Sequence, residues 1–166
     1  GKYVTAVSMT GSPEGLMTIG DPKHPLPALV AETVAAHAHE FAVYPPNDGT
    51  PELRAAIAGW IARRYGVTLD PETRIIPLNG TREGLFNAAL AIAPERKNGG
   101  APAFLLPNPF YQVYTVAAVT SLAEPIYVPA TAQTGFLPDY AGLPAATLDR
   151  VTVAYLCSPA NPQGAV

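Results

Sequence analysis

Apolar positions recur along this chain with two different periods, and the periods predict where helices and strands form. Between Thr50 and Gly66 the apolar residues return every three to four positions, which predicts an amphipathic helix. Thr50 favours the N-cap, Pro51 fits the first helical position, and Gly66 favours a stop at the C-terminal end. We expect Trp60, which lies on the apolar stripe of this helix, to be part of the core.

From residue 74 onwards, strand-like and helix-like segments alternate. The predicted elements are a helix over about 27–40, strands over 74–78, 103–106, 125–128 and 151–156, and helices over 82–93 and 111–122. Strands that alternate with helices of this length predict a parallel sheet flanked by helices. Ligands bind at the carboxyl ends of the strands in such sheets, so the loops after Leu78, Leu106 and Leu156 are candidate sites.

Composition narrows the class of protein. The chain has 166 residues and a formal net charge of -3, which suits one domain, or one large domain with a small appendage, and argues against nucleic acid or an anionic membrane as partner. No apolar run reaches the ~20 residues of a membrane-spanning helix, and the N-terminus lacks a signal-peptide pattern. A single cysteine, Cys157, fits a reducing compartment. We therefore expect a soluble cytoplasmic protein.

No metal site is expected. His37 and His39 are two residues apart on a predicted helix, so their side chains point to different faces. That spacing favours solvated surface histidines over shared metal ligation.

The loop after Leu78 runs from Asn79 through Gly80 directly into a predicted helix. A glycine loop at a helix N-terminus offers unpaired backbone N–H groups and the positive end of the helix dipole to an anion. Thr81 adds a hydroxyl and Arg82 adds a positive charge. An ordinary helix start, capped by Thr81 and without a ligand, is the alternative interpretation.

The other two loops carry an aromatic pair and a rigid amide. Phe110 and Tyr111 follow the strand that ends near Leu106, where they either face a planar ligand or pack into the core. Asn161 lies between two prolines, so its side-chain amide either has a set direction towards a ligand or closes a local Asx turn. Taken together, the three loops suit a planar, phosphorylated ligand.

Four stretches extend this interpretation: "YPPNDGTPELRAAIAGWIARRYG", "NGTREGLFNAALA", "PNPFYQVY" and "SPANPQG". In this order and spacing the chain resembles the N-terminal part of the class I/II, fold-type I aminotransferases, which use pyridoxal 5'-phosphate (PLP). The resemblance implies an α/β fold, a three-layer sandwich around a mostly parallel sheet, present here as an incomplete N-terminal portion. Residues 1–40 would belong to or lead from the small domain, and residues 41–166 would form the N-terminal half of the PLP-binding large domain.

The resemblance also implies roles for single residues. The turn at Gly80 and the amides of Thr81 and Arg82 would hold the PLP phosphate. Tyr111 would stack on the pyridine ring, and Asn161 would form a hydrogen bond with its phenolic oxygen. The family commonly has threonine where this chain has Gln163, which has no part in these roles.

Two further implied contacts involve a second subunit and the substrate. In a homodimer with shared active sites, Tyr44 would reach the phosphate of the neighbouring subunit, and Gly20 would lie near the substrate carboxylate. The Schiff-base lysine of the family is expected downstream of Val166, so this chain would hold no catalytic residue and alone should be inactive. The lysines present do not follow a strand in a way that would replace it: Lys2, Lys23 and Lys97.

The resemblance predicts transamination between an amino acid and a keto acid. The stretches "IGDPKHP" and "NGTREGLF" resemble N-succinyldiaminopimelate aminotransferases, which implies N-succinyl-diaminopimelate and glutamate as substrates in lysine biosynthesis. Two alternatives stay open. One is a PLP-dependent β-lyase or decarboxylase of the same fold, and the other is a non-catalytic fragment or pseudo-enzyme that binds a partner through an exposed sheet edge.

Overall fold

The computed structural model describes residues 24–166, and the chain divides into two compact units between Asn47 and Asp48. The described part of the first unit holds helix α1 (Ala28–Ala36) and the 3-10 helix η1 (Ala38–Ala42). The helix predicted over about 27–40 therefore ends earlier, because the α-helical hydrogen bonds close at His37, whose N–H donates to the Thr33 carbonyl at 3.1 Å.

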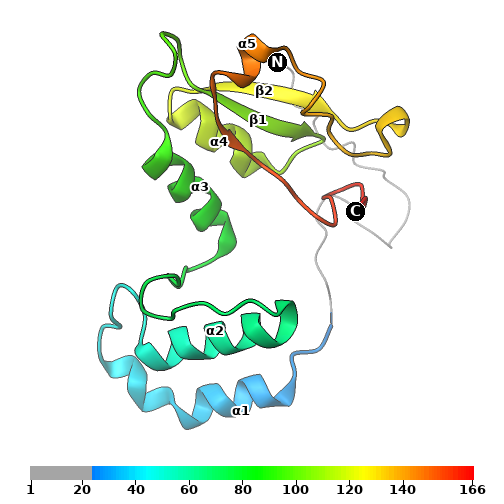
Figure 1. The fold of residues 1–166 in the computed structure, drawn as a ribbon. Coiled ribbons are helices and arrows are strands. Elements are labelled where there is room, and N and C mark those ends of the chain that lie inside the picture. The colour runs from blue at the N-terminus through cyan, green and yellow to red at the C-terminus, as the bar shows by residue number, and fades with distance from the viewer. Residues whose placement is uncertain (1–23) are drawn as a thin grey trace, which may run out of the picture. The chain divides into compact units, whose positions relative to one another are not determined.

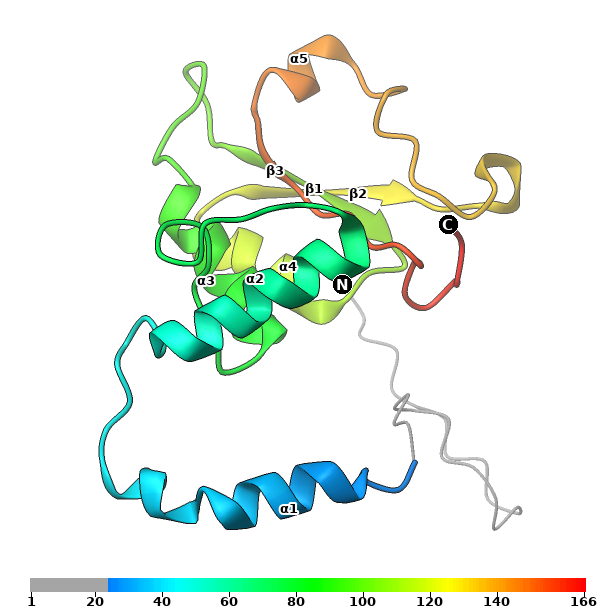
Figure 2. The same cartoon turned by 60° about the horizontal axis from the view of Figure 1, so that its bottom comes forward.

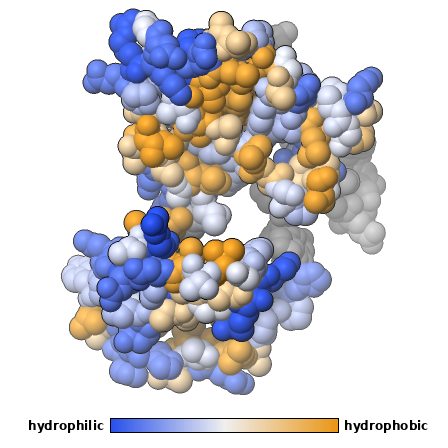
Figure 3. Space-filling view, viewed as in Figure 1, coloured by the Kyte–Doolittle hydropathy of each residue, from blue (hydrophilic) through white to orange (hydrophobic). Residues whose placement is uncertain are grey.

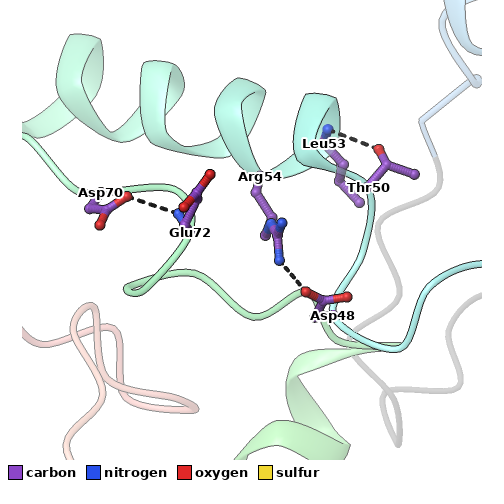
Figure 4. Close-up of polar contacts among 6 residues, drawn as sticks. All are labelled: Asp48, Thr50, Leu53, Arg54, Asp70 and Glu72. Carbon is purple, nitrogen blue, oxygen red and sulfur yellow. Dashed lines mark hydrogen bonds and ion pairs between the residues drawn. The ribbon is translucent and has the colours of Figure 1, made fainter.

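In the second unit, α2 (Pro51–Tyr65) has the ends that its sequence predicts. The hydroxyl of Thr50 accepts a hydrogen bond from the Leu53 N–H at 3.2 Å (Figure 4). At the other end, Gly66 closes the helix with a φ of 69°. The Arg54 guanidinium pairs with the Asp48 carboxylate, which fixes the turn before the helix (Figure 4).

The predicted core position of Trp60 is wrong, because 52% of the residue is exposed. Its ring packs edge-on against Tyr65 of the same helix, with ring centroids 5.6 Å apart. A helical period predicts which face of α2 is apolar, but it does not predict what covers that face.

The centre of the second unit is a three-stranded parallel sheet of order β2-β1-β3 (Figure 1; all three strands are labelled in Figure 2). Its strands are β1 (Ala103–Asn108), β2 (Glu124–Pro129) and β3 (Val151–Ala154). Residues 103–107 of the central strand are all buried, as expected for a strand with neighbours on both sides. The parallel sheet predicted from the sequence is confirmed.

Helices precede and connect the strands of this sheet. α3 (Thr81–Ile92) packs against α4 (Gln112–Thr120), and α4 contacts β1 and β2. The connection from β2 to β3 holds η2 (Ala132–Thr134) and α5 (Ala145–Leu148), and it lies on the side of the sheet away from α4 (Figure 2). This arrangement follows from the right-handed rule, because the two crossovers step in opposite directions along the sheet.

The strand predicted over 74–78 is wrong. Residues 75–78 have no regular secondary structure and pair with no strand among the described residues. Pro77 has no N–H to donate to a ladder, and an extended segment becomes a strand only through such pairing. Ile75 is buried whereas Ile76 is 75% exposed, so the segment keeps the alternation of a strand without its partner.

The core joins β1, α4 and the start of the loop after β3. Phe104 and Leu106 of β1 are fully buried, and Tyr114 of α4 stacks on Tyr155 with ring centroids 4.2 Å apart. The other buried members of this cluster are Ala89, Val113, Ala117, Ala118 and Ala123. Strand, helix and loop therefore share one apolar layer.

Large apolar side chains also remain exposed on this unit, and hydrophobic patches are visible on the face that Figure 3 shows. Ile76, Leu78, Ile92 and Leu156 are each more than half exposed. Exposed apolar patches typically mark surfaces that another segment or chain covers. No helix of residues 24–166 has the length and apolar character needed to cross a membrane.

Candidate cofactor site

The loops after β1 and β3 leave the sheet at the same end, because the two strands are parallel and their carboxyl ends lie together. β2 and β3 lie on opposite sides of β1, so the strand order reverses at the central strand, and ligands bind at such reversals in open α/β sheets. Pro107 from the end of β1, and Cys157, Ser158 and Asn161 from the loop after β3, line one cavity of about 260 Å³. Two of the three predicted loops therefore meet.

The N-terminus of α3 is open to an anion. Gly80 is the N-cap residue with a φ of 149°, and no side chain caps the helix. The first backbone N–H bonded within this turn is that of Gly84, which donates to the Gly80 carbonyl at 3.2 Å, so the preceding N–H groups, including those of Thr81 and Arg82, are left for a ligand or water. The alternative in which Thr81 caps the helix is wrong.

Space is available beside this helix start. A Cβ at Gly80 would have no neighbouring atom within 4 Å, apart from the adjoining residues of the chain. Thr81 and Arg82 are both exposed. The positive end of the helix dipole, the free N–H groups and the open approach fit a phosphate group.

The starts of α3 and α4 lie next to one another. Arg82 and Glu83 of α3 line a second cavity of about 260 Å³ together with Gln112 and Val113 of α4. Tyr111, the N-cap residue of α4, is therefore brought close to the helix start that carries Arg82.

The two aromatic residues of this loop are both partly buried against the core. The Tyr111 ring packs edge-on against Tyr114 with centroids 5.8 Å apart, and the Phe110 ring contacts Tyr127 at 5.1 Å. Part of the surface of each ring is therefore buried by core packing, while the rest of each ring stays exposed.

Asn161 is exposed, and among residues 24–166 no hydrogen bond involves its side chain. The Asx turn weighed as an alternative is therefore not formed. Gln163 lines the same cavity, and its side-chain oxygen is buried without a hydrogen-bond partner in the described part of the chain. At this cavity the Asn161 side-chain amide is therefore available to a polar ligand.

The remaining predicted residues lie elsewhere. Tyr44 belongs to the first unit and is fully exposed, and Gly20 lies outside the described residues. The ammonium of Lys97 donates to the carbonyl of Val151, the first residue of β3, at the end of the strand opposite to the candidate loops. Lys97 is therefore not placed to meet a ligand at the carboxyl edge.

Sequence reasoning missed Tyr155, which lines the cavity beside Asn161 and also the 240 Å³ cavity beside Thr81. Its signal was weak, because a tyrosine in the run "VTVAYLC" looks like any large residue of a buried strand. Among residues 24–166, no group of acidic, histidine or cysteine side chains could hold a metal ion.

Comparison with known proteins identifies the family of this chain. The family model for aminotransferases of class I and II matches residues 15–166. The chain belongs to this family. Its members use pyridoxal 5'-phosphate, and the uncapped helix start, partly exposed tyrosine and free amide found here fit a planar phosphate ester.

Among curated proteins of this aminotransferase family, the chain is 36% identical over 151 residues to the LL-diaminopimelate aminotransferase of Moorella thermoacetica. It is 37% identical over 150 residues to the enzyme of the same name from Desulforudis audaxviator. Each match covers 89% of this chain and 37% of the relative, so the chain spans little more than a third of the length of these relatives.

Solved structures of aminotransferases share the fold. The aminotransferase from Neisseria meningitidis is 38% identical with a TM-score of 0.82, and substrate-bound BacF from Bacillus subtilis is 32% identical with a TM-score of 0.80. Both matches cover 89% of this chain and 37% of the solved chain. The α/β fold with a parallel sheet, expected from the resemblance, is confirmed.

Proposed function

We propose that the protein carrying this chain is a PLP-dependent aminotransferase that moves an amino group between an amino acid and a keto acid. The observation that carries the proposal is the uncapped N-terminus of α3 at Gly80 in a chain of the aminotransferase family. The first turn of this helix shares a cavity with the first turn of α4, which directly follows Tyr111. Bound PLP would supply an electron sink for the amino-acid carbon that loses or gains a proton.

The residues of this chain bind and orient the cofactor in this proposal. The turn at Gly80 and the N–H groups of Thr81 and Arg82 hold the phosphate, supported by the helix dipole. Tyr111 covers one face of the ring, and Asn161 forms a hydrogen bond with the phenolic oxygen from the loop after β3. Two arrangements support this assignment: the loops after β1 and β3 meet in one cavity, and the first turns of α3 and α4 line a second.

Other parts of the site come from outside the second unit. We propose that Tyr44 contacts the phosphate of the neighbouring subunit in a cytoplasmic homodimer, and full exposure of its side chain is compatible with that role. Gly20 would contact the substrate carboxylate. The lysine that anchors the cofactor would follow Val166, since Lys97 is held at the other end of the sheet.

The substrate we propose is a diaminopimelate-type amino acid, with glutamate and its keto acid as the second pair. Several of the relatives are named LL-diaminopimelate aminotransferase, while the stretches "IGDPKHP" and "NGTREGLF" favour the N-succinylated form. The two candidate substrates differ in whether one amino group is free or acylated, so the same assay can compare them.

The test uses the full-length protein with PLP, 2-oxoglutarate, and either LL-diaminopimelate or its N-succinyl derivative. We expect glutamate to form with one of the two and only when the keto acid is present. Carbon dioxide formed without the keto acid would instead indicate a decarboxylase. Pyruvate and ammonia formed from a β-substituted amino acid such as cystathionine, which has the leaving group on Cβ that diaminopimelate lacks, would indicate a β-lyase. A protein that binds PLP but forms no product would favour the non-catalytic alternative.

Tyr111 offers a direct test of the cofactor assignment. Tyr111→Ala removes the ring, and we expect the dissociation constant for PLP to rise about tenfold, the value that a lost aromatic contact of ~1.4 kcal/mol gives. Tyr111→Phe is the matched control and should bind PLP within about twofold of the unchanged protein. Equal affinities for all three proteins, measured by cofactor fluorescence, would contradict the stacking role.

A further inference from the structure

Tyr155 connects the three parts of the proposed cofactor site. It directly follows β3, is 6% exposed, and its hydroxyl donates a hydrogen bond to the Leu85 carbonyl of α3 at 3.0 Å. Leu85 lies one helical turn after Thr81, and both line the cavity that Tyr155 also lines. The hydroxyl therefore holds the first turns of the helix whose N-terminus is the proposed phosphate site.

The ring of Tyr155 is connected through aromatic contacts to Tyr111, the residue proposed to cover one face of the PLP ring. It stacks on Tyr114 with centroids 4.2 Å apart and planes inclined by 14°, and Tyr114 meets Tyr111 edge-on at 5.8 Å. The Tyr155 ring also meets Phe104 of β1 edge-on, with ring centroids 6.4 Å apart. Aromatic rings in such contact restrict one another's orientation, so the position of Tyr155 influences that of Tyr111 through one intermediate ring.

The backbone of Tyr155 fixes the start of the loop that carries Asn161. Its N–H donates to the Leu105 carbonyl of β1 at 3.0 Å, and its carbonyl accepts from the Tyr140 hydroxyl at 2.8 Å. The loop thus departs from a residue whose backbone and side chain are all bonded.

Packing alone does not require the hydroxyl at this position. A phenylalanine would fill nearly the same volume, and burying a hydroxyl is unfavourable unless it finds a partner. The hydroxyl of Tyr155 finds that partner in the carbonyl of a separate element, which makes it an orienting contact between the end of β3 and α3.

From these contacts we infer that Tyr155 is a positioning residue of the cofactor site, which sets α3 so that its N-terminus holds the phosphate. The inference rests on the proposed function, since it presumes that PLP binds at this helix. It adds a residue that touches no part of the ligand in that proposal and acts through Leu85.

The test compares Tyr155→Phe with Tyr127→Phe in the full-length protein. Both variants lose one tyrosine hydroxyl that donates a hydrogen bond, but only Tyr155 donates to α3, whereas Tyr127 donates to the Thr115 hydroxyl of α4 at 3.3 Å. We expect the dissociation constant for PLP to rise about fivefold in Tyr155→Phe and by less than about twofold in Tyr127→Phe, the range that a single net hydrogen bond gives. Pyridoxal, which lacks the phosphate, should bind all three proteins with similar affinity.

A second measurement does not depend on the cofactor. Hydrogen exchange of the hydrogen-bonded backbone amides of α3, from Gly84 onwards, should be faster in Tyr155→Phe than in Tyr127→Phe, because only the first variant removes the contact between the end of β3 and the Leu85 carbonyl. Unchanged exchange, or a loss of PLP affinity that is equal in the two variants or equal for pyridoxal, would overturn the inference. If the unchanged protein fails to bind PLP, the proposed function itself fails, and the exchange result then shows separately whether Tyr155 holds α3.

Discussion

The backbone at Gly80 has a φ of 149°, in a region that residues with a Cβ rarely enter. The space beside it is open, so the restriction comes from the backbone conformation and not from crowding. This single residue leads the chain from the irregular segment 74–79 into α3 and leaves the helix start without a side-chain cap. The absence of a side chain therefore has two effects: it permits the backbone turn, and it leaves the N-terminus of α3 accessible.

We predict that Gly80→Ala lowers the free energy of unfolding by about 1–3 kcal/mol, the usual cost of holding a residue with a Cβ in such a conformation. Gly59→Ala is the matched control, because Gly59 lies inside α2 and meets only the end of the Arg63 side chain. In the control, alanine should stabilise the helix by up to about 1 kcal/mol. Denaturant unfolding of both variants measures the difference, and equal effects would contradict the role of backbone strain.

At the scale of elements, local signals decided which predictions succeeded. α2 could be bounded from the sequence because Thr50, Pro51 and Gly66 act within a few residues of the helix ends. The segment 74–78 has the composition of a strand, but strand formation depends on a partner that local sequence does not specify. The prediction that Trp60 is buried was wrong for the same reason, since burial depends on what packs over the helix.

The residues of the candidate site also differ in whether local sequence could predict them. Gly80 and Asn161 could be found because glycine and proline set the backbone around them locally. Tyr155 could not, because its importance comes from the Leu85 carbonyl, 70 residues away in the chain. Contacts over such separations follow from the topology of the sheet and not from spacing in the sequence.

The N-cap of α2 gives a prediction at this scale. Thr50→Ala removes the acceptor of the Leu53 N–H, and we expect the free energy of unfolding to fall by about 1 kcal/mol. Thr50→Ser keeps the hydroxyl and should stay within a few tenths of a kcal/mol of the unchanged protein. Thermal or denaturant unfolding checks this, and an alanine variant as stable as the serine variant would show that the cap contributes little.

On the scale of the whole second unit, three tyrosines hold the layers together. Burial raises the pKa of the Tyr114 and Tyr155 hydroxyls above the ordinary value, and it raises the pKa of Tyr140 to about 12. The folded protein therefore retains protons at these groups that the unfolded chain releases near pH 10. Below pH 10 all three are neutral in both states, and their contribution to stability is fully present.

Stability should consequently fall as the pH rises from about 10 to about 12, where the unfolded chain binds fewer protons than the folded protein. We expect Tyr140→Phe to make this fall shallower, because it removes the group with the pKa of about 12. Denaturant unfolding at several alkaline pH values, alongside the ultraviolet absorbance of ionised tyrosine, measures both effects. A stability that does not change over this interval would contradict the burial of these hydroxyls.

The strand order β2-β1-β3 also has a consequence for how the protein is made. β1, α4 and β2 are contiguous in the chain, so this crossover unit can form as soon as residue 129 has left the ribosome. β3 follows only when the 25 residues from 130 to 154 have been added, which takes roughly 1–5 s at the usual rate of synthesis. During that interval the nascent chain carries a central strand with one open side, and this temporary edge is where a chaperone or a neighbouring chain would bind first.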